Sequence, residues 1–171
     1  NATMGRFKEA IEDYLRFTAV YPHHYLGTLN LGIAYLKSDQ LDQAVSTLET
    51  AITLTGGDKK ARAYYNLGIA YYRLTPPAHE KSAEAFTNAI RIRPDYVEAR
   101  YWHALVEPDT KKGRENAIDQ LLKVVAIRPN YAPAYFKLGS LYGAEQQREL
   151  AEQALTVLHR SLTFQVPARV E

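Results

Sequence analysis

The sequence contains no cysteine, which excludes disulfide bonds, cysteine nucleophiles and zinc–thiolate centres. It also has no excess of one charge, because 21 lysines and arginines face 19 aspartates and glutamates, a net charge of +2. Surfaces that bind nucleic acids or anionic lipids concentrate basic residues. No apolar run approaches the ~18 residues that suggest a membrane span. We therefore expect neither nucleic-acid binding nor membrane insertion.

Motifs of catalysis are missing as well. The sequence has no glycine-rich loop that could cradle phosphate, no paired carboxylates and no nucleophile with a neighbouring base. Among its five histidines, His23 and His24 are adjacent, and adjacent side chains on a turn seldom converge on one metal ion. His103 is expected on a packing face of a helix. We therefore predict that the chain is not an enzyme and holds no metal or cofactor.

What the sequence does contain is an internal repeat. Residues 61–72 read Ala-Arg-Ala-Tyr-Tyr-Asn-Leu-Gly-Ile-Ala-Tyr-Tyr, and similar stretches occur at 25–36, 97–107 and 132–143. The copies start 36, 36 and 35 residues apart. A period in the thirties is typical of proteins built from stacked helical repeats, so the repeat indicates the fold before any local pattern is considered.

Apolar residues recur at helical spacing along nearly the whole chain. Prolines and glycines separate the segments, and Gly56-Gly57 is expected to end one helix. No segment alternates as a strand does, so we predict an all-α fold. Because the connections are short, neighbouring helices should be antiparallel. The pattern predicts about nine helices, at 6–20, 25–37, 41–54, 59–74, 79–92, 96–106, 111–127, 131–144 and 147–163, followed by a frayed tail.

These residues resemble the tetratricopeptide repeat, whose first helix carries an aromatic residue, then Leu-Gly, then tyrosine. The clearest copy has Tyr64, Leu67-Gly68 and Tyr71. The second helix of the pattern carries small alanines around a large apolar residue, matched here by Ala85, Phe86 and Ala89. The resemblance implies an alpha-alpha superhelix, or solenoid, forming a single domain over 1–171. Its parts would be a half repeat 5–24, repeats 25–60, 61–96, 97–131 and 132–163, and a tail 164–171.

The resemblance also explains the small residues of the pattern. Gly32, Gly68 and Gly139 are expected where two helices cross with almost no gap, so that a side chain there would overpack at a cost of about 1–3 kcal/mol. Two departures stand out. Ser82 occupies a slot that usually holds alanine, and in the copy at 97–107 His103 stands where the leucine belongs.

In this family the concave surface, lined by first helices, holds a partner peptide. The stripe beside the packing face of each first helix is therefore the predicted groove. Asn30 and Asn66 share one slot a repeat apart, and an amide can both donate to and accept from a peptide backbone. The predicted groove residues are Leu29, Asn30, Ile33, Lys37, Arg62, Tyr65, Asn66, Ile69, Tyr72, Arg73, Tyr101, Trp102, Phe136 and Lys137.

Other interpretations of the same residues stay open. The asparagines could be solvated surface residues, and the aromatic residues could serve packing between repeats. The carboxylate clamp of some family members is matched only in part, because Ile33 and Ile69 stand where that clamp needs polar amides. A mixed groove that favours an extended segment with some negative charge fits the residues better.

We predict a protein–protein interaction module that binds a peptide or partner protein. The alternative is a structural scaffold, such as a homodimer, that associates through terminal helices whose apolar residues would be exposed: Ile11, Phe17, Leu155, Leu158 and Leu162. We also expect the chain to be a piece of a larger protein, in which an enzyme domain could lie elsewhere. The sequence assigns no compartment: the cytoplasm is slightly favoured and the periplasm stays open.

Overall fold

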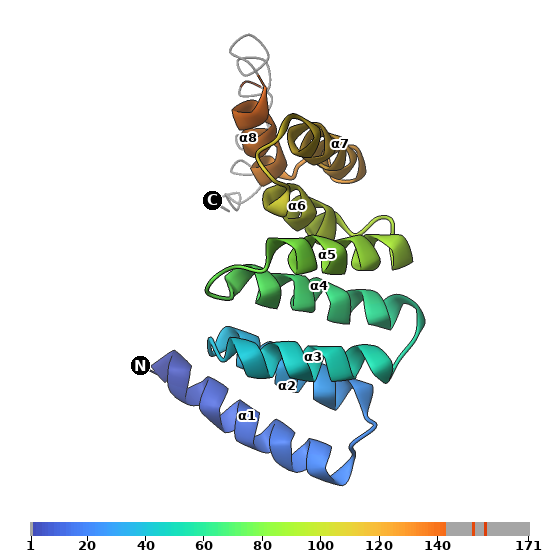
Figure 1. Cartoon of the computed structure of the whole chain (residues 1–171). Coiled ribbons are helices and arrows are strands. Elements are labelled where there is room, and N and C mark those ends of the chain that lie inside the picture. The colour runs from blue at the N-terminus through green and yellow to red at the C-terminus, as the bar shows by residue number, and fades with distance from the viewer. Residues whose placement is uncertain (1, 143–151, 153–155, 157–171) are drawn as a thin grey trace, which may run out of the picture. The chain divides into compact units, whose positions relative to one another are not determined.

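The computed structural model describes residues 2–142, 152 and 156, and its described part is built from helices without strands (Figure 1). Its helices are α1 (Ala2–Val20), α2 (Tyr25–Lys37), α3 (Leu41–Thr53), α4 (Gly57–Arg73), α5 (His79–Ile92), α6 (Val97–Val106), α7 (Lys111–Ile127) and α8 (Ala132–Leu141). The prediction of an all-α helical-repeat fold is confirmed. The predicted ninth helix at 147–163 and the tail lie outside the described residues.

The chain divides into two compact units, Asn1–Trp102 and His103–Glu171. The N-terminal unit holds α1 to α5, which lie side by side as layers, together with the first part of α6 (Figure 1). The C-terminal unit contains the rest of α6, α7 and α8. The division falls within 97–107, the copy of the repeat that departs furthest from the others.

The N-terminal unit is held together at close helix crossings. A β-carbon built on Gly68 in α4 would lie 2.7 Å from the ring of Phe86 in α5, and one on Gly32 would lie 2.8 Å from Leu48. Both large side chains are fully buried. The close approach predicted at these two glycines is confirmed. At Gly139 a β-carbon would meet no described atom within 4 Å, and the helix predicted to cross there is outside the described part.

The crossing of α4 and α5 also explains the serine in an alanine slot. Ser82 is fully buried, and its hydroxyl donates a hydrogen bond of 2.8 Å to the carbonyl oxygen of Gly68. A buried hydroxyl without a partner would be costly, whereas this one is satisfied. Ser82 therefore packs as an alanine would and adds a polar tie between the two helices.

The prediction about the role of the glycine pair is wrong. The helix α3 ends at Thr53, with Leu54 as its C-cap, so the glycine pair does not end it. Instead, Gly56 is the N-cap of α4 and Gly57, with a positive φ of 59°, is its first residue. Glycine is needed there because few other residues adopt that backbone conformation.

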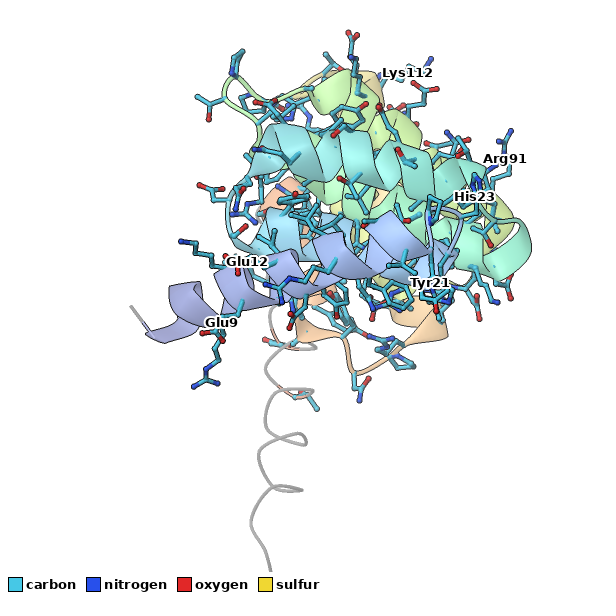
Figure 2. All side chains as sticks on the ribbon, turned by 90° about the horizontal axis from the view of Figure 1, so that it is seen from below. Glu9, Glu12, Tyr21, His23, Arg91 and Lys112 are labelled. Carbon is cyan, nitrogen blue, oxygen red and sulfur yellow. The ribbon has the colours of Figure 1, made fainter. Side chains whose placement is uncertain are left out.

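The first helix was expected to leave Ile11 exposed, and this is also wrong. Ile11 is only 7% exposed and packs with Leu31 and Ala34 of α2. The outer side of α1 carries charged residues, among them Glu9 and Glu12, whose side chains point away from the ribbon (Figure 2). The burial of Ile11 removes one of the reasons for expecting self-association at this end. The three leucines of the C-terminal end are outside the described residues.

Candidate functional site

A chain of aromatic rings runs over α4, α5 and α6 in the N-terminal unit. The ring of Trp102 lies 5.3 Å from Tyr72 and 6.4 Å from Phe86, measured between ring centroids. Tyr65 lies 6.1 Å from Phe86 and 5.0 Å from Tyr96. Phe86 and Tyr96 are buried, whereas Tyr65, Tyr72 and Trp102 are half-buried. We call Tyr65, Tyr72 and Trp102 the aromatic strip; the buried pair supports it.

The positions of the strip follow from helix geometry. Tyr65 and Tyr72 are seven residues apart, which places them on one face of α4 two turns from each other. Ring pairs at these separations contribute roughly 0.5–1.5 kcal/mol each beyond the burial of their area. The strip is therefore rigidly placed and still partly open to solvent, and half-exposed tyrosine and tryptophan are the usual anchors of protein interfaces.

Basic residues flank the strip near Tyr65. The guanidinium of Arg93 lies 3.4 Å from the ring centroid of Tyr96, in a cation–π contact. Burial raises the pKa of Tyr96, and the positive charge of Arg93 opposes that rise. The exposed Arg62 of α4 also acts on Tyr96 and on Tyr25, so its charge lies near both hydroxyls. The negative charge of Glu98 also acts on Tyr96 and raises its pKa, so charges of both signs lie near this ring.

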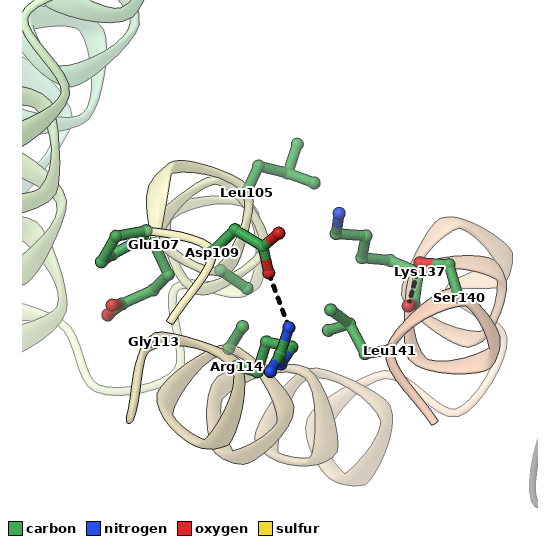
Figure 3. A pocket seen from close by; sticks show the side chains of 11 residues that line it. Leu105, Glu107, Asp109, Gly113, Arg114, Lys137, Ser140 and Leu141 are labelled. Carbon is green, nitrogen blue, oxygen red and sulfur yellow. Dashed lines mark hydrogen bonds and ion pairs between the residues drawn. The ribbon is translucent and has the colours of Figure 1, made fainter. Parts of the chain in front are cut away.

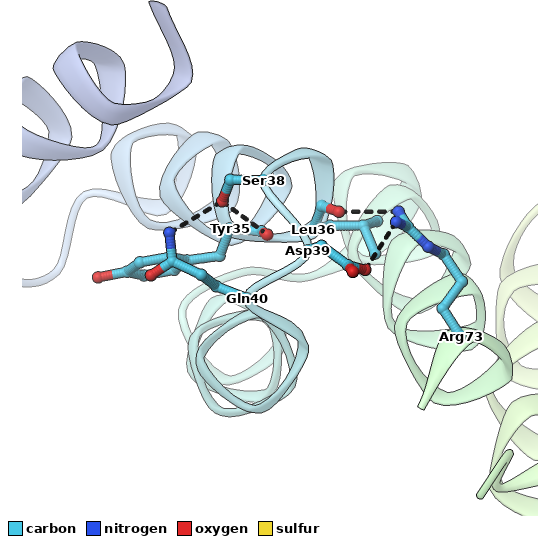
Figure 4. A network of polar contacts seen from close by, with 6 residues as sticks. All are labelled: Tyr35, Leu36, Ser38, Asp39, Gln40 and Arg73. Carbon is cyan, nitrogen blue, oxygen red and sulfur yellow. Dashed lines mark hydrogen bonds and ion pairs between the residues drawn. The ribbon is translucent and has the colours of Figure 1, made fainter. Parts of the chain in front are cut away.

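Arg73 belongs to the predicted groove, but its guanidinium is engaged within the protein. Its Nη1 donates to the carbonyl oxygen of Leu36 at 2.8 Å, and its Nη2 lies 2.9 Å from a carboxylate oxygen of Asp39 (Figure 4). These contacts tie the end of α4 to the last turn of α2 and to the connection between α2 and α3. The structure thus gives Arg73 a structural task that the sequence pattern did not indicate.

The two asparagines that share a slot in the repeat differ in how available their side-chain amides are to a ligand. Asn66 is buried, with 9% of its surface exposed, and its amide nitrogen donates 2.8 Å to the carbonyl oxygen of Arg62 in its own helix. Asn30 is half-buried. A side chain that bonds its own helix has less capacity left for a ligand backbone.

Other predicted groove residues lie in different surroundings. Leu29 is fully buried in the core, against which Ile33 and Ile69 pack, so its assignment to a ligand-facing surface is wrong. The sequence pattern allows a leucine on either face of a helix, and in the structure Leu29 lies on the face that packs in the core. Lys37 is exposed, with its ammonium 6.0 Å from the ring of Phe7. Tyr101 is half-buried, and burial raises its pKa.

The C-terminal unit contains a pocket of about 250 Å³, which we call the α6–α8 pocket (Figure 3). Lys137, a predicted groove residue, lines it, whereas its neighbour Phe136 is 80% exposed and does not. The Asp109 carboxylate lies 2.9 Å from Arg114 Nη1. Lining residues come from α6, the following connection, α7 and α8: Ala104, Leu105, Glu107, Pro108, Asp109, Gly113, Arg114, Ala117, Lys137, Ser140 and Leu141.

Two features of the described residues bear on other kinds of function. No three or more histidine and acidic side chains gather there in a way that could hold a metal ion. None of the described helices combines the length and the apolar character that crossing a membrane requires.

Comparison with curated proteins gives two partial matches. Over 134 residues the chain is 30% identical to UDP-N-acetylglucosamine--peptide N-acetylglucosaminyltransferase of Giardia intestinalis, covering 76% of this chain and 9% of that protein. Over 114 residues it is 28% identical to Superkiller complex protein 3 of Homo sapiens, covering 67% of this chain and 7% of that protein. The chain thus spans less than a tenth of the length of either relative.

Solved structures match over nearly the whole chain. A crystal structure of MamA superposes with a TM-score of 0.80 at 26% identity, covering 95% of this chain and 94% of that one. YrrB, described as a TPR protein with an unusual peptide-binding site, superposes with a TM-score of 0.70 at 16% identity, covering 91% and 80%. This second likeness shows the fold alone.

The family comparison covers more than half of the chain. Residues 2–59 and 29–97 each match the model for the family described as Tetratricopeptide repeat. The matched residues include α1 to α5, with the close helix crossings at Gly32 and Gly68. The chain therefore belongs to the tetratricopeptide repeat family, whose fold serves protein–protein interaction.

Proposed function

We propose that this chain binds an extended segment of a partner protein against the aromatic strip. One observation supports the proposal above the others: Tyr65, Tyr72 and Trp102, all predicted from their slots in the repeat, belong to one connected set of ring contacts and keep part of their surface open. YrrB, which has a similar fold, is described as having a peptide-binding site.

The physical case rests on anchors that are held in place before a ligand arrives. Aromatic side chains offer a large contact area and lose little conformational freedom on binding, especially when buried rings already support them. Phe86 and Tyr96 provide this support under the strip. An apolar or aromatic side chain of the partner would pack on Trp102 and Tyr72, while Arg62 favours an acidic neighbour in the same segment.

The single tryptophan of the chain provides the assay. Peptides selected on the intact chain from a random displayed library are titrated while the emission of Trp102 is followed. We expect saturable emission changes, and we expect Tyr72→Ala to weaken binding by about ten-fold or more, as removal of an interface anchor does. The affinity of Trp102→Ala is measured by calorimetry, because that variant has no tryptophan emission.

Tyr21→Ala is the matched control, because Tyr21 is an exposed aromatic residue beyond the end of α1 (Figure 2). It should bind the selected peptides as the natural chain does. If the peptides bind Tyr72→Ala and Trp102→Ala with unchanged affinity, the strip is not the binding surface. Melting curves of all variants show whether a loss of affinity reflects a loss of folding.

A further inference from the structure

The α6–α8 pocket is lined by two basic residues, Arg114 and Lys137. Arg114 is paired with Asp109 at 2.9 Å across the pocket wall. Lys137 forms no ion pair with any residue in the described part of the chain, and Figure 3 shows its side chain extending from α8 into the pocket. The Ser140 hydroxyl donates a hydrogen bond of 2.7 Å to the backbone carbonyl oxygen of Lys137, so this bond does not involve the Lys137 ammonium.

The second acidic residue of the pocket faces another group. A carboxylate oxygen of Glu107 lies 3.4 Å from Nδ1 of His103 one turn earlier on α6. Both side chains are largely buried, with 12% and 14% of their surface exposed. In Figure 3 the Glu107 carboxylate is turned away from Lys137. The ammonium of Lys137 thus has no acidic partner among the described residues.

The size and the lining of the pocket limit which group of a partner could bind there. Its volume of about 250 Å³ is below the roughly 300–1,000 Å³ typical of sites for whole small molecules. Leu105 and Leu141 line it beside Lys137. A single side chain with a short aliphatic stem and a terminal negative charge matches both these leucines and the ammonium.

We propose that the α6–α8 pocket binds a glutamate side chain of a partner protein. The carboxylate accepts a charge-assisted hydrogen bond from Nζ of Lys137, and the methylene groups of the glutamate pack on Leu105 and Leu141. This is a second binding site, in the C-terminal unit. It does not require a ligand at the aromatic strip.

A short synthetic peptide tests the proposal. The probe is the blocked peptide acetyl-Ala-Leu-Glu-Leu-Ala-amide, titrated into the isotope-labelled chain while backbone amide signals are followed by nuclear magnetic resonance. We expect saturable shifts at Leu105, Arg114 and Leu141. The peptide with glutamine in place of glutamate has the same shape without the charge and should bind at least about ten-fold more weakly, since a charge-assisted bond is lost.

Variants of the chain complete the experiment. Lys137→Gln should lower the affinity for the glutamate peptide by about ten-fold or more, and Lys137→Arg should retain most of it. Lys123→Gln is the control, because Lys123 is an exposed lysine of α7 that pairs with Asp119 and is not among the lining residues. It should not change the affinity.

Several outcomes would overturn the proposal. These are the absence of saturable shifts at the pocket, equal binding of the glutamate and glutamine peptides, or equal loss in Lys123→Gln and Lys137→Gln. A phosphoserine peptide that binds more than about ten-fold tighter than the glutamate peptide would assign the pocket to a phosphorylated partner instead. Amide shifts report the pocket and Trp102 emission reports the strip, so either proposal can fail while the other stands.

Discussion

The ring of Phe17 occupies the space that a β-carbon on Gly27 would need. A β-carbon built on that glycine would lie 2.7 Å from two ring atoms of Phe17, at the junction of α1 and α2. One repeat later, Ala51 and Ala63 take the corresponding positions, and both are fully buried. At the junction of α1 and α2, Phe17 and Gly27 therefore take the places of these two alanines. One large side chain fills the space that two small side chains fill one repeat later.

This exchange predicts a strong coupling between the two positions. Gly27→Ala alone should lower the free energy of unfolding by about 1–3 kcal/mol, because the ring of Phe17 must move. The double variant Phe17→Ala, Gly27→Ala restores the pair of alanines found in the next repeat. It should be more stable than the sum of the two single losses predicts, as urea denaturation of all four proteins would show.

Additive losses of unfolding free energy would contradict the prediction that Phe17 and a side chain at position 27 compete for the same space. If the losses of the two single variants add within about 0.5 kcal/mol, the positions do not interact and the contact has no energetic weight. The ring of Phe17 also contacts Tyr21 and His24, with centroids 5.0 Å away in each case. Phe17→Ala will therefore be destabilising by itself, and only the interaction term of the cycle tests the prediction.

Two substitutions of Asp39, in the connection between α2 and α3, should differ in their effect on stability. It has a positive φ of 64° and its carboxylate lies 2.9 Å from Arg73 (Figure 4). Asp39→Gly loses an exposed ion pair worth about 0–1 kcal/mol but relieves a backbone cost of similar size. Its unfolding free energy should stay within about 0.5 kcal/mol of the natural value.

Asp39→Ala loses the ion pair and keeps the strained backbone. It should be about 1–2 kcal/mol less stable than Asp39→Gly, the cost of a left-handed conformation for a residue with a β-carbon. Thermal or urea unfolding of the two variants measures this difference. Equal stability of the glycine and alanine variants would mean that the backbone conformation at this position carries no cost.

Much of the fold could be predicted from the sequence because it depends on local and repeated signals. Helical spacing of apolar residues gave elements whose ends lie within a few residues of the observed ones, as for α2 and α5. The glycine of each Leu-Gly pair predicted a helix crossing, and at Gly68 the ring of Phe86 fills the space. Each of these signals comes from a single residue whose size suits only one role in packing.

The candidate site was less predictable, since it depends on how side chains turn and which partners they meet. The contact of Arg73 with Leu36 joins residues 37 positions apart, and no local pattern records it. Leu29 shows a second limit, because a small rotation of α2 decides whether a leucine faces core or solvent. The pair Asp109–Arg114 joins the irregular connection after α6 to the start of α7, where the repeat pattern gives no guidance.

His24 is predicted to stabilise α2 as its N-cap. Its Nδ1 accepts a hydrogen bond of 3.1 Å from the backbone N–H of Gly27, and its ring packs on Phe17. His24→Ala removes both contacts and should cost about 1–2 kcal/mol of unfolding free energy. His24→Asn keeps a capping acceptor and should fall between the natural chain and the alanine variant. If asparagine is no better than alanine in urea denaturation, the cap contributes nothing.

Tyr71 should make the stability of the chain depend on pH at the alkaline end. Burial raises its pKa to about 12, helped by the hydrogen bond of 2.7 Å that its hydroxyl donates to Glu49 and by the charges of Glu49 and Glu84. An unfolded chain releases this proton near its ordinary pKa of about 10. The folded state therefore binds the proton more tightly, and this contribution to stability is present below about pH 10 and is lost as pH rises toward 12.

Carbon-labelled tyrosine followed by nuclear magnetic resonance separates Tyr71 from the other tyrosines. We expect its titration well above the ordinary pKa of tyrosine. Glu49→Gln should lower the pKa of Tyr71 but leave it above the ordinary value, because burial is the largest cause. In Tyr71→Phe the unfolding free energy should fall less steeply above pH 10 than in the natural chain. An ordinary pKa for Tyr71 in the folded protein would show that its hydroxyl is solvated and not held by Glu49.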